Sequence, residues 1–267
     1  MSSRLPKYIS KLGFIDGFKF YISIKINKLA YGNELPNFKP FHYLFEAKSG
    51  LEIGGPSQIF RVNNALPIYR LAKKVDGCNF STNTFWEGAL KEGSNYNYQD
   101  NKEAGYQFIC EGNNLESIQN EFYDFLLSSH SLEHFANPLK ALQEWLGILK
   151  INGTLVLVLP DKRLTFDCNR PITKFEHLKA DFENNTSEND LTHLDEILEL
   201  HDYKQTPEIK DRTFYYNRSL KNFENRFLHH HVFDDELLKE IFSFFKIEFL
   251  YQDFAYPFHL IMMGRKQ

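Results

Sequence analysis

Hydrophobic and polar positions along the middle of the chain follow two different periods. Short apolar runs of strand length stand at residues 51–54, 106–110, 122–129 and 154–160. Between the last two runs, leucines recur at helical spacing at positions 139, 142, 146 and 149. Strands that alternate with helices are typical of βα units, so the pattern predicts an α/β fold with a parallel sheet.

Residues at the segment ends predict where two helices begin. Asn137 and Pro138 form an N-cap and first-turn pair before the leucine-rich helix, and Asp234 precedes a second helix over residues 235–245. Two further strand-like runs follow, at 246–255 and 258–266. Because only a short turn separates them, we expect an antiparallel pair at the end of the chain.

Composition limits the classes of protein that this chain can be. With 267 residues, 42% of them hydrophobic, the chain can bury one sizeable core. A net charge of −4 gives little attraction to nucleic acid, so we expect no nucleic-acid partner. Three distant cysteines favour a reducing, cytoplasmic setting. No apolar run reaches the roughly 20 residues of a membrane span, and the first residues lack the features of a signal peptide.

Charge is unevenly distributed, and this suggests a division of the chain. Residues 1–40 hold seven Lys and Arg against two acidic residues. This basic N-terminal extension suits peripheral contact with an anionic membrane surface, at the inner membrane face, but we prefer a solvated helix or strand packed on the main domain. Residues 176–202 carry nine acidic residues and a single lysine. We interpret them as part of a helical insertion, over about residues 170–228, in a domain that spans residues 41–267.

The strand at 51–54 carries Glu52 and runs into a glycine-rich turn, Gly54-Gly55-Pro56-Ser57. Glycines at the carboxyl end of a parallel strand let the backbone approach a ligand without interference from a Cβ atom. Glu52 would be costly as an unpaired buried charge, so it should accept hydrogen bonds. The donors are either the hydroxyl or ammonium groups of a ligand or the amides of the turn itself.

These segments together resemble the class I S-adenosylmethionine-dependent methyltransferases, of the methyltransferase type 11 kind. LEIGGPS is similar to their first motif, YDFLLSSHSLEH to the strand and loop after the adenine of the cofactor, and NPLKALQEWLGILKINGTLVLVLPD to their helix, turn and fifth strand. The resemblance spans roughly Tyr43 to Asp161. It implies a Rossmann-like, seven-stranded, mostly parallel sheet with an antiparallel last strand, a helical insertion and an N-terminal extension.

The resemblance also implies a set of cofactor-binding residues. They are Glu52, Gly54, Gly55, Pro56, Ser57, Asp76, Glu111, Ser129 and His130. The turn would line the methionine end of S-adenosylmethionine, Glu111 would lie beside the adenine, and the last two residues would close the pocket. The sequence PSQ replaces the usual third glycine, and spacing assigns the ribose-binding acidic residue to Asp76, with Glu87 as the next choice.

Two histidine clusters belong to the acceptor end of the same predicted pocket. His130, Glu133 and His134 stand at offsets that place them on one side of a helical turn, and three consecutive histidines occupy 229–231. We expect the clusters to meet at the rim of the pocket. The catalytic residues predicted from this arrangement are His130, Asp161 and His230.

Two chemistries are compatible with these histidines. In the first, which we prefer, His130 is a general base, because an imidazole pKa of about 6.5 allows it to accept a hydroxyl proton at neutral pH. In the second, His130, Glu133 and His134 hold a divalent metal together with one of residues 229–231. The second resembles the E-x-x-E-H metal site of small-RNA 2′-O-methyltransferases, with His130 in place of the first glutamate.

The predicted function is therefore S-adenosylmethionine-dependent methyl transfer. We expect O-methylation of a small molecule or of a sugar of a surface glycan, since the basic leader loosely resembles those of glycan-modifying methyltransferases. A nicotinamide-dependent oxidoreductase is the first alternative. It is disfavoured because the segment GGPSQ lacks the G-x-G-x-x-G spacing of dinucleotide-binding turns. A non-catalytic module that only binds the cofactor is the second.

Overall fold

The computed structural model describes residues 33–206 and 208–267. The predicted N-terminal extension therefore lies mostly outside the described residues, and the division of the chain at residue 40 stays a prediction. The first described element is the 3₁₀ helix η1 (Pro36–Leu44), which packs Phe38 into the core. None of the helices in the described part of the chain is long and apolar enough to cross a membrane.

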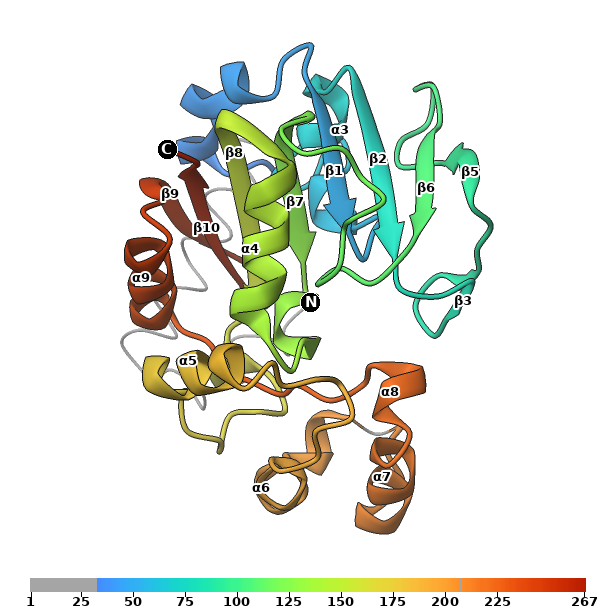
Figure 1. Cartoon of the computed structure of the whole chain (residues 1–267), viewed down its shortest axis with the longest axis vertical. Coiled ribbons are helices and arrows are strands. Elements are labelled where there is room, and N and C mark those ends of the chain that lie inside the picture. The colour runs from blue at the N-terminus through green and yellow to red at the C-terminus, as the bar shows by residue number, and fades with distance from the viewer. Residues whose placement is uncertain (1–32, 207) are drawn as a thin grey trace, which may run out of the picture.

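One large sheet organises the molecule (Figure 1). Its strands are β1 (Ser49–Ile53), β2 (Lys74–Asn79), β5 (Gly93–Tyr96), β6 (Gly105–Ile109), β7 (Tyr123–Ser129), β8 (Leu149–Pro160), β9 (Glu248–Ala255) and β10 (His259–Arg265). Their spatial order is β5-β6-β2-β1-β7-β8-β10-β9. Short strands β3 (Asn83–Thr84) and β4 (Gly88–Ala89) form a separate hairpin.

The pairing of these strands confirms the predicted fold class. β6, β2, β1, β7 and β8 run parallel to one another, while β10 is antiparallel to both β8 and β9. The crossover order around β1 is that of an open α/β sheet with a central switch point. The structure adds one element to the seven predicted strands, because the short β5 pairs antiparallel with β6 at the sheet edge.

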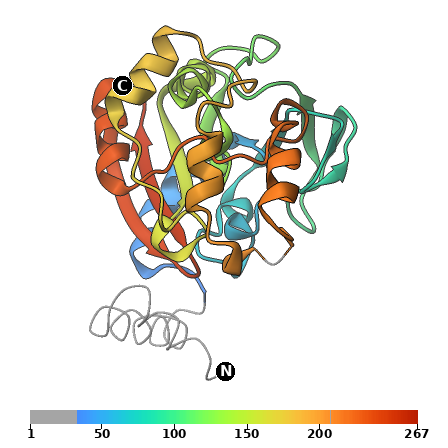
Figure 2. The ribbon, with the colours of Figure 1, turned by 90° about the horizontal axis from the view of Figure 1, so that it is seen from below.

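Helices cover both faces of the sheet. They are α3 (Ile68–Leu71), α4 (Pro138–Ile148), α5 (Phe175–Glu183), α6 (Leu194–Leu200), α7 (Arg212–Ser219), α8 (Asn222–Asn225) and α9 (Asp235–Phe244), with the 3₁₀ turns η2 (Gln58–Phe60), η3 (Leu132–His134), η4 (Lys162–Leu164) and η5 (Tyr203–Gln205). Figure 2 shows α4 and α5 on the side of the sheet opposite to η1. The predicted caps are confirmed: Asn137 accepts a hydrogen bond from Lys140 N, and Asp234 accepts one from Leu237 N.

Alternation along the strands builds one core on each face. Leu126 of β7 joins the cluster under α4 and α9, whereas its neighbours Phe125 and Leu127 join the cluster under η1 and α3. The residues of β8 divide in the same way between the two clusters. Successive side chains of a strand point to opposite faces, so a central strand covered on both sides is apolar throughout. This explains the unbroken apolar run at 154–160.

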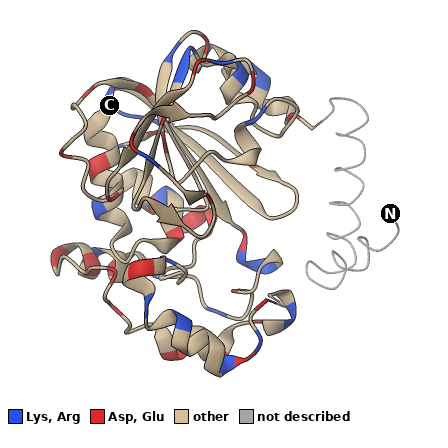
Figure 3. Cartoon of the chain, turned by 90° about the vertical axis from the view of Figure 1, so that its right-hand side faces the viewer, with Lys and Arg blue, Asp and Glu red and all other residues tan. Residues whose placement is uncertain are grey.

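A third, smaller cluster holds the helical segment between β8 and α9 together. Its buried members are Leu194, Ile197, Leu198, Ile209, Tyr215 and Leu228. Figure 1 shows α6, α7 and α8 beyond the carboxyl ends of the central strands. Figure 3 shows basic and acidic positions interspersed along the ribbon of the described residues. The segment therefore closes the end of the sheet where open α/β folds bind ligands.

Candidate active site

A cavity of about 950 Å³ lies between the carboxyl ends of the strands and the helical segment. This is near the upper end of the roughly 300–1,000 Å³ usual for ligand pockets. One wall comes from the ends of β1, β2 and β7, and includes Gly54, Asn79 and Ser129. The opposite wall comes from residues after β8, from Leu164 to His229. Sheet and helical segment thus contribute to one site.

The glycine turn after β1 forms the floor of the strand-side wall. Gly54 has φ +78°, a left-handed conformation that favours glycine, and a Cβ there would overlap Ser131 Oγ. Its amide donates to Cys78 O at 2.9 Å, which ties the turn to the end of β2. Pro56 and Ser57 also line the cavity. The structure therefore brings three of the predicted turn residues to the pocket.

Glu52 and Gly55, in contrast, do not line the cavity. Glu52 is fully buried on the η1 side of the sheet and accepts hydrogen bonds from Ser57 N at 3.0 Å, from Tyr96 Oη at 2.6 Å and from Tyr69 Oη. A Cβ on Gly55 would overlap the Glu52 carboxyl group. Burial raises the pKa of Glu52, although these hydrogen bonds oppose the effect. The expectation of direct cofactor contact is corrected: this carboxylate holds the turn from behind.

Asp76 does not line the pocket either, so its assignment to the ribose is corrected. It lies in mid-strand in β2, where it accepts hydrogen bonds from Tyr123 Oη at 2.8 Å and Tyr106 N at 2.7 Å. The carboxyl end of β2 is Asn79, which lines the cavity and donates to Gly55 O at 3.2 Å. Spacing alone misplaced the residue because the strand continues three residues beyond Asp76.

Two of the acidic residues that line the cavity, Glu111 and Glu87, were named from the sequence. Glu111 follows β6 and forms an ion pair of 2.5 Å with Arg226, which comes from the end of α8. Burial raises the pKa of Glu111, whereas Arg226 lowers it. Glu87 lies in the turn before β4, and partial burial raises its pKa. Glu111 and Glu87 are thus candidate carboxylates for the cofactor at the strand-side wall.

His130 lies at the rim next to Ser129, as predicted, with φ +52°. Both of its ring nitrogens already face protein groups. Nε2 is 2.7 Å from His259 Nδ1, and Nδ1 is 3.5 Å from Glu133 Oε1. Burial lowers the pKa of His259 to about 3, so it meets His130 as a neutral imidazole. These two contacts occupy the positions from which His130 would accept a proton.

Glu133, His134 and His229 converge in the centre of the acceptor end. One ligand-type atom from each lies within 4.8 Å of the others. Glu133 is almost completely buried, and neither carboxylate oxygen has a hydrogen-bond partner among residues 33–206 and 208–267. Burial alone would raise the pKa of Glu133, but the imidazoles of His130, His134 and His229 lower it. The group holds Glu133, His134 and one member of the histidine triplet from the predicted metal set, but not His130.

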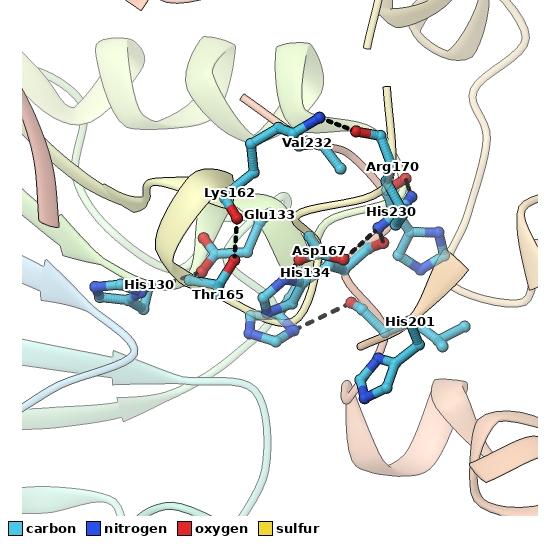
Figure 4. Close-up of polar contacts among 12 residues, drawn as sticks. His130, Glu133, His134, Lys162, Thr165, Asp167, Arg170, His201, His230 and Val232 are labelled. Carbon is cyan, nitrogen blue, oxygen red and sulfur yellow. Dashed lines mark hydrogen bonds and ion pairs between the residues drawn. The ribbon is translucent and has the colours of Figure 1, made fainter. Parts of the chain in front are cut away.

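His229 is held by a buried ionic network. Its Nδ1 lies 2.5 Å from Asp167 Oδ2, and Arg170 Nη1 lies 3.1 Å from Asp167 Oδ1. Burial alone would lower the pKa of His229, but the Asp167 carboxylate raises it. Burial alone would raise the pKa of Asp167, but His229 and Arg170 lower it to about 2. Figure 4 shows Asp167 and Arg170 on one side of Glu133 and His134, with His130 on the other.

Asp161 and His230, both predicted as catalytic, lie outside the cavity wall. Asp161 caps η4 and pairs with Arg163 at 2.6 Å. His230 is buried against Asn222 at 2.9 Å, and burial lowers its pKa to about 3. The structure thus places His229, and not the predicted His230, at the cavity wall, with Asp167 as its partner. The sequence offers the three histidines at 229–231 as candidates, but no neighbouring residue indicates which imidazole faces the pocket.

Aromatic side chains complete the acceptor wall. Trp86 lies 5.3 Å from both His134 and Phe227, measured between ring centroids, and Phe166 lies 4.7 Å from His229. Trp86 is about half exposed. Flat apolar surfaces of this kind contact the face of a ring-shaped ligand, while the neighbouring histidines supply polar contacts.

Comparison with known proteins identifies the class to which this arrangement belongs. Residues 64–157 match the family model described as Methyltransferase domain. The matched residues run from shortly after η2 through most of β8, and together with the strand order around β1 they support an S-adenosylmethionine-dependent methyltransferase of class I. No match to a curated protein was found.

Solved structures with a similar course of the chain are described as S-adenosylmethionine-dependent methyltransferases. One from Aquifex aeolicus is 12% identical, covers 91% of this chain and 97% of its own, and has a TM-score of 0.44. One from Methanosarcina mazei is 15% identical, with coverages of 88% and 98% and a TM-score of 0.46. One from Archaeoglobus fulgidus is 12% identical, with coverages of 93% and 100% and a TM-score of 0.43.

The strand-side wall fits the cofactor of this class. The left-handed Gly54 leaves room that a side chain would fill, and the Asn79 amide and Glu111 carboxylate offer acceptors for hydroxyl and amino groups. The residues that would hold S-adenosylmethionine are Gly54, Pro56, Ser57, Asn79, Glu111, Ser129 and His130. Asn79 is an amide where an acidic residue was expected, so the chain offers the ribose one side-chain acceptor oxygen in place of two.

Proposed function

We propose that this methyltransferase O-methylates a hydroxyl group of a small molecule or of a sugar from a surface glycan. The single observation that carries the proposal is the buried Asp167–His229 pair at the wall of the cavity. Transfer to a hydroxyl requires removal of a proton, whereas many other acceptors need only alignment. When bound, S-adenosylmethionine supplies an electrophilic methyl group. The remaining chemistry belongs to the side chains of this chain.

His229 has the properties of a general base. Its Nδ1 faces Asp167, so the proton on Nδ1 is fixed and the lone pair lies on Nε2. Within the described residues, no hydrogen bond to Nε2 is found. The proton of the acceptor hydroxyl moves to Nε2, and the Asp167 carboxylate stabilises the resulting imidazolium. In this role His229 replaces His130, whose two ring nitrogens face His259 and Glu133.

The choice of acceptor rests on the walls of the cavity. Trp86, Phe227 and Phe166 offer apolar faces to a ring, and the volume of about 950 Å³ leaves room for an acceptor beside a cofactor. These features support a sugar, or another ring that carries a hydroxyl group, as the methyl acceptor. Contact of the leader with a membrane surface and a cytoplasmic location stay predictions, because residues 1–32 lie outside the described part.

A second mechanism uses the same residues with a divalent metal. Glu133, His134 and His229 offer three mixed ligands, and burial lowers the pKa of His134 to about 4, which keeps it neutral and able to bind a metal. His229 cannot serve as a base and as a metal ligand through the same Nε2 atom. Activity that survives chelation therefore supports the general base, and activity that is lost and restored by added metal supports the second mechanism. The family match sets aside the oxidoreductase alternative.

The proposal is tested by turnover on a panel of acceptors. Purified protein is incubated with labelled S-adenosylmethionine and with nucleotide sugars, glycan extracts, phenols and amines. We expect methyl groups on oxygen, and a loss of about 10²–10⁴-fold in kcat for His229→Ala, as for removal of a general base. His130→Ala is the matched comparison at the rim and should lose less. Methylation of nitrogen alone, or binding of S-adenosylhomocysteine without turnover on any acceptor, would contradict the proposal.

A further inference from the structure

Four metal-ligating side chains meet outside the cavity. His177 and Asp181 lie one turn apart on α5, His193 is the residue before α6, and His231 precedes α9. One ligand-type atom from each lies within 4.8 Å of all the others. They come from three separate segments of the chain, and nothing in the methyltransferase site uses them. Residues at i and i+4 share one face of a helix, so α5 presents two of the four together.

The distances between these atoms match a tetrahedral site. His177 Nε2 lies 3.0 Å from His193 Nε2 and 3.2 Å from Asp181 Oδ2, and His231 Nε2 lies 3.5 Å from the same oxygen. Zinc bonds to imidazole nitrogen and carboxylate oxygen measure about 2.0–2.2 Å, which separates neighbouring ligands of a tetrahedron by roughly 3.3–3.5 Å. These three separations, of the six in a four-ligand site, lie around the value expected for ligands of one ion.

Hydrogen bonding alone leaves the cluster unsatisfied. Asp181 Oδ2 is buried and has no hydrogen-bond partner among the described residues, while Asp181 Oδ1 accepts from Thr186 Oγ1. His177 Nε2 faces both His193 and Asp181 but can carry only one proton. His231 Nε2 lies 3.2 Å from Ala136 O, to which it can donate a hydrogen bond, and its buried Nδ1 has no hydrogen-bond partner among the described residues. To bind an ion through Nε2, the ring would carry its proton on Nδ1 and give up the hydrogen bond to Ala136. A buried acceptor without a donor is costly, and a cation would satisfy it.

The geometry points to a structural zinc site formed by His177, Asp181, His193 and His231. Three imidazoles and one carboxylate are ligands that Zn²⁺ takes, and four protein ligands leave no open position for a substrate. Asn137 Nδ2 donates to Asp181 O at 2.9 Å, which helps to fix the carboxylate-bearing turn.

The site would join the helical segment to the rest of the domain. Its ligands connect α5, the start of α6 and the segment 229–231, and that segment also carries the cavity residue His229. His177 is 43% exposed, so an ion can enter from solvent. Zinc would thus hold in place the part of the chain that forms the acceptor wall. This role is independent of the proposed hydroxyl acceptor.

The test is metal binding by the full chain, prepared without a histidine tag and dialysed against a chelator. We expect one equivalent of Zn²⁺ to bind, the midpoint of thermal unfolding to rise, and Co²⁺ in place of zinc to give the intense visible bands of tetrahedral coordination. Loss of even an outer-shell partner weakens metal binding by roughly 10–100-fold, and His177→Ala and His193→Ala should weaken it at least as much. Both residues are partly exposed, so the variants should fold.

Two controls separate this site from the cavity cluster. Lys179→Ala changes an exposed residue of the same helix and should leave zinc binding unchanged. Glu133→Gln removes a ligand from the cavity cluster and should also leave it unchanged. Zinc binding that is lost in Glu133→Gln but kept in His177→Ala would overturn the assignment. Failure of the dialysed wild-type chain to bind zinc or cobalt would overturn it as well.

Discussion

A buried glutamate lies on each side of the cavity, and the two differ in their hydrogen bonding and in the direction of their pKa shifts. Glu52, behind the glycine turn, accepts hydrogen bonds from one amide and two tyrosines. Glu133, at the acceptor end, has no hydrogen bond to either oxygen from the described residues and is surrounded by three imidazoles. Burial raises the pKa of Glu52, while the imidazoles lower that of Glu133.

This contrast separates a structural carboxylate from a functional one. A buried polar group normally has its partners, so a carboxylate left without donors in a pocket indicates a role toward a proton or a ligand. Glu52 maintains the shape of the cofactor turn, whereas Glu133 sets the charge around His134 and His229. The two ends should therefore respond differently to substitution, the first in stability and the second in activity.

The largest effect on stability is expected for Glu52→Ala. It leaves the buried hydroxyls of Tyr69 and Tyr96 without their acceptor, and each such loss costs about 1–3 kcal/mol, so we expect a decrease of about 3 kcal/mol or more in the free energy of unfolding. Urea unfolding measures it. Glu52→Gln, which keeps an acceptor oxygen, is the matched control and should lose less. Equal stability of Glu52→Ala and wild type would remove the structural half of the comparison.

The acceptor end should contribute stability that is lost in acid. The pKa of Asp167 is about 2 in the folded protein against an ordinary 3.8, so this carboxylate stabilises the fold above pH 3.8 and loses that contribution as the pH falls toward 2. The contribution amounts to about 2 kcal/mol. We expect the difference in unfolding free energy between wild type and Asp167→Asn to shrink over this interval. A difference that is constant from pH 6 to pH 2 would show that Asp167 is not ionically coupled to His229.

Gly54→Ala tests the cofactor turn directly. A left-handed conformation costs an ordinary residue about 1–2 kcal/mol, and the new Cβ would overlap Ser131 Oγ. We expect lower stability and weaker binding of S-adenosylhomocysteine, both measurable by calorimetry. The double variant with Ser131→Ala removes the overlap but keeps the backbone cost, so it should recover only part of the loss. Gly147→Ala in α4, where a Cβ meets only Asn120 at 3.7 Å, should not destabilise the protein.

The two sides also differ in how far the sequence predicts them. The strand, the turn and the caps depend on neighbours within a few residues, and Gly54, Ser57 and Ser129, which local patterns assigned to a pocket, line the cavity. Strand alternation even contains the reason why Glu52 leaves the pocket, because Leu51 and Ile53 lie in the core of the opposite face. Asp76 was misplaced because spacing does not reveal where a strand ends.

The acceptor side depends on contacts between distant residues. His229 is distinguished from His230 and His231 only by Asp167, which lies 62 positions earlier in the chain. Asp167 stands in a loop after η4 without a periodic pattern around it. The helical segment then turns each of the three histidines toward a different partner: Asp167, Asn222 or Asp181. No local rule encodes that choice.

The smallest change in stability, and the sharpest test of the contrast, is expected for Glu133→Gln. Since no hydrogen bond to Glu133 is found in the described part, removal of its charge should change the free energy of unfolding by less than about 1 kcal/mol.

The same variant should shift the pH dependence of activity. The charge of Glu133 raises the pKa of His229, so the neutral variant should hold the proton of His229 less tightly. Because a general base must be unprotonated, activity rises with pH through the pKa of His229. The midpoint of that rise should therefore move to lower pH, by up to about one unit. The pH profile of kcat/KM measures the shift, with Glu87→Gln at the opposite wall as the control. A strongly destabilised Glu133→Gln with an unchanged profile would mean that Glu133, like Glu52, has a structural role.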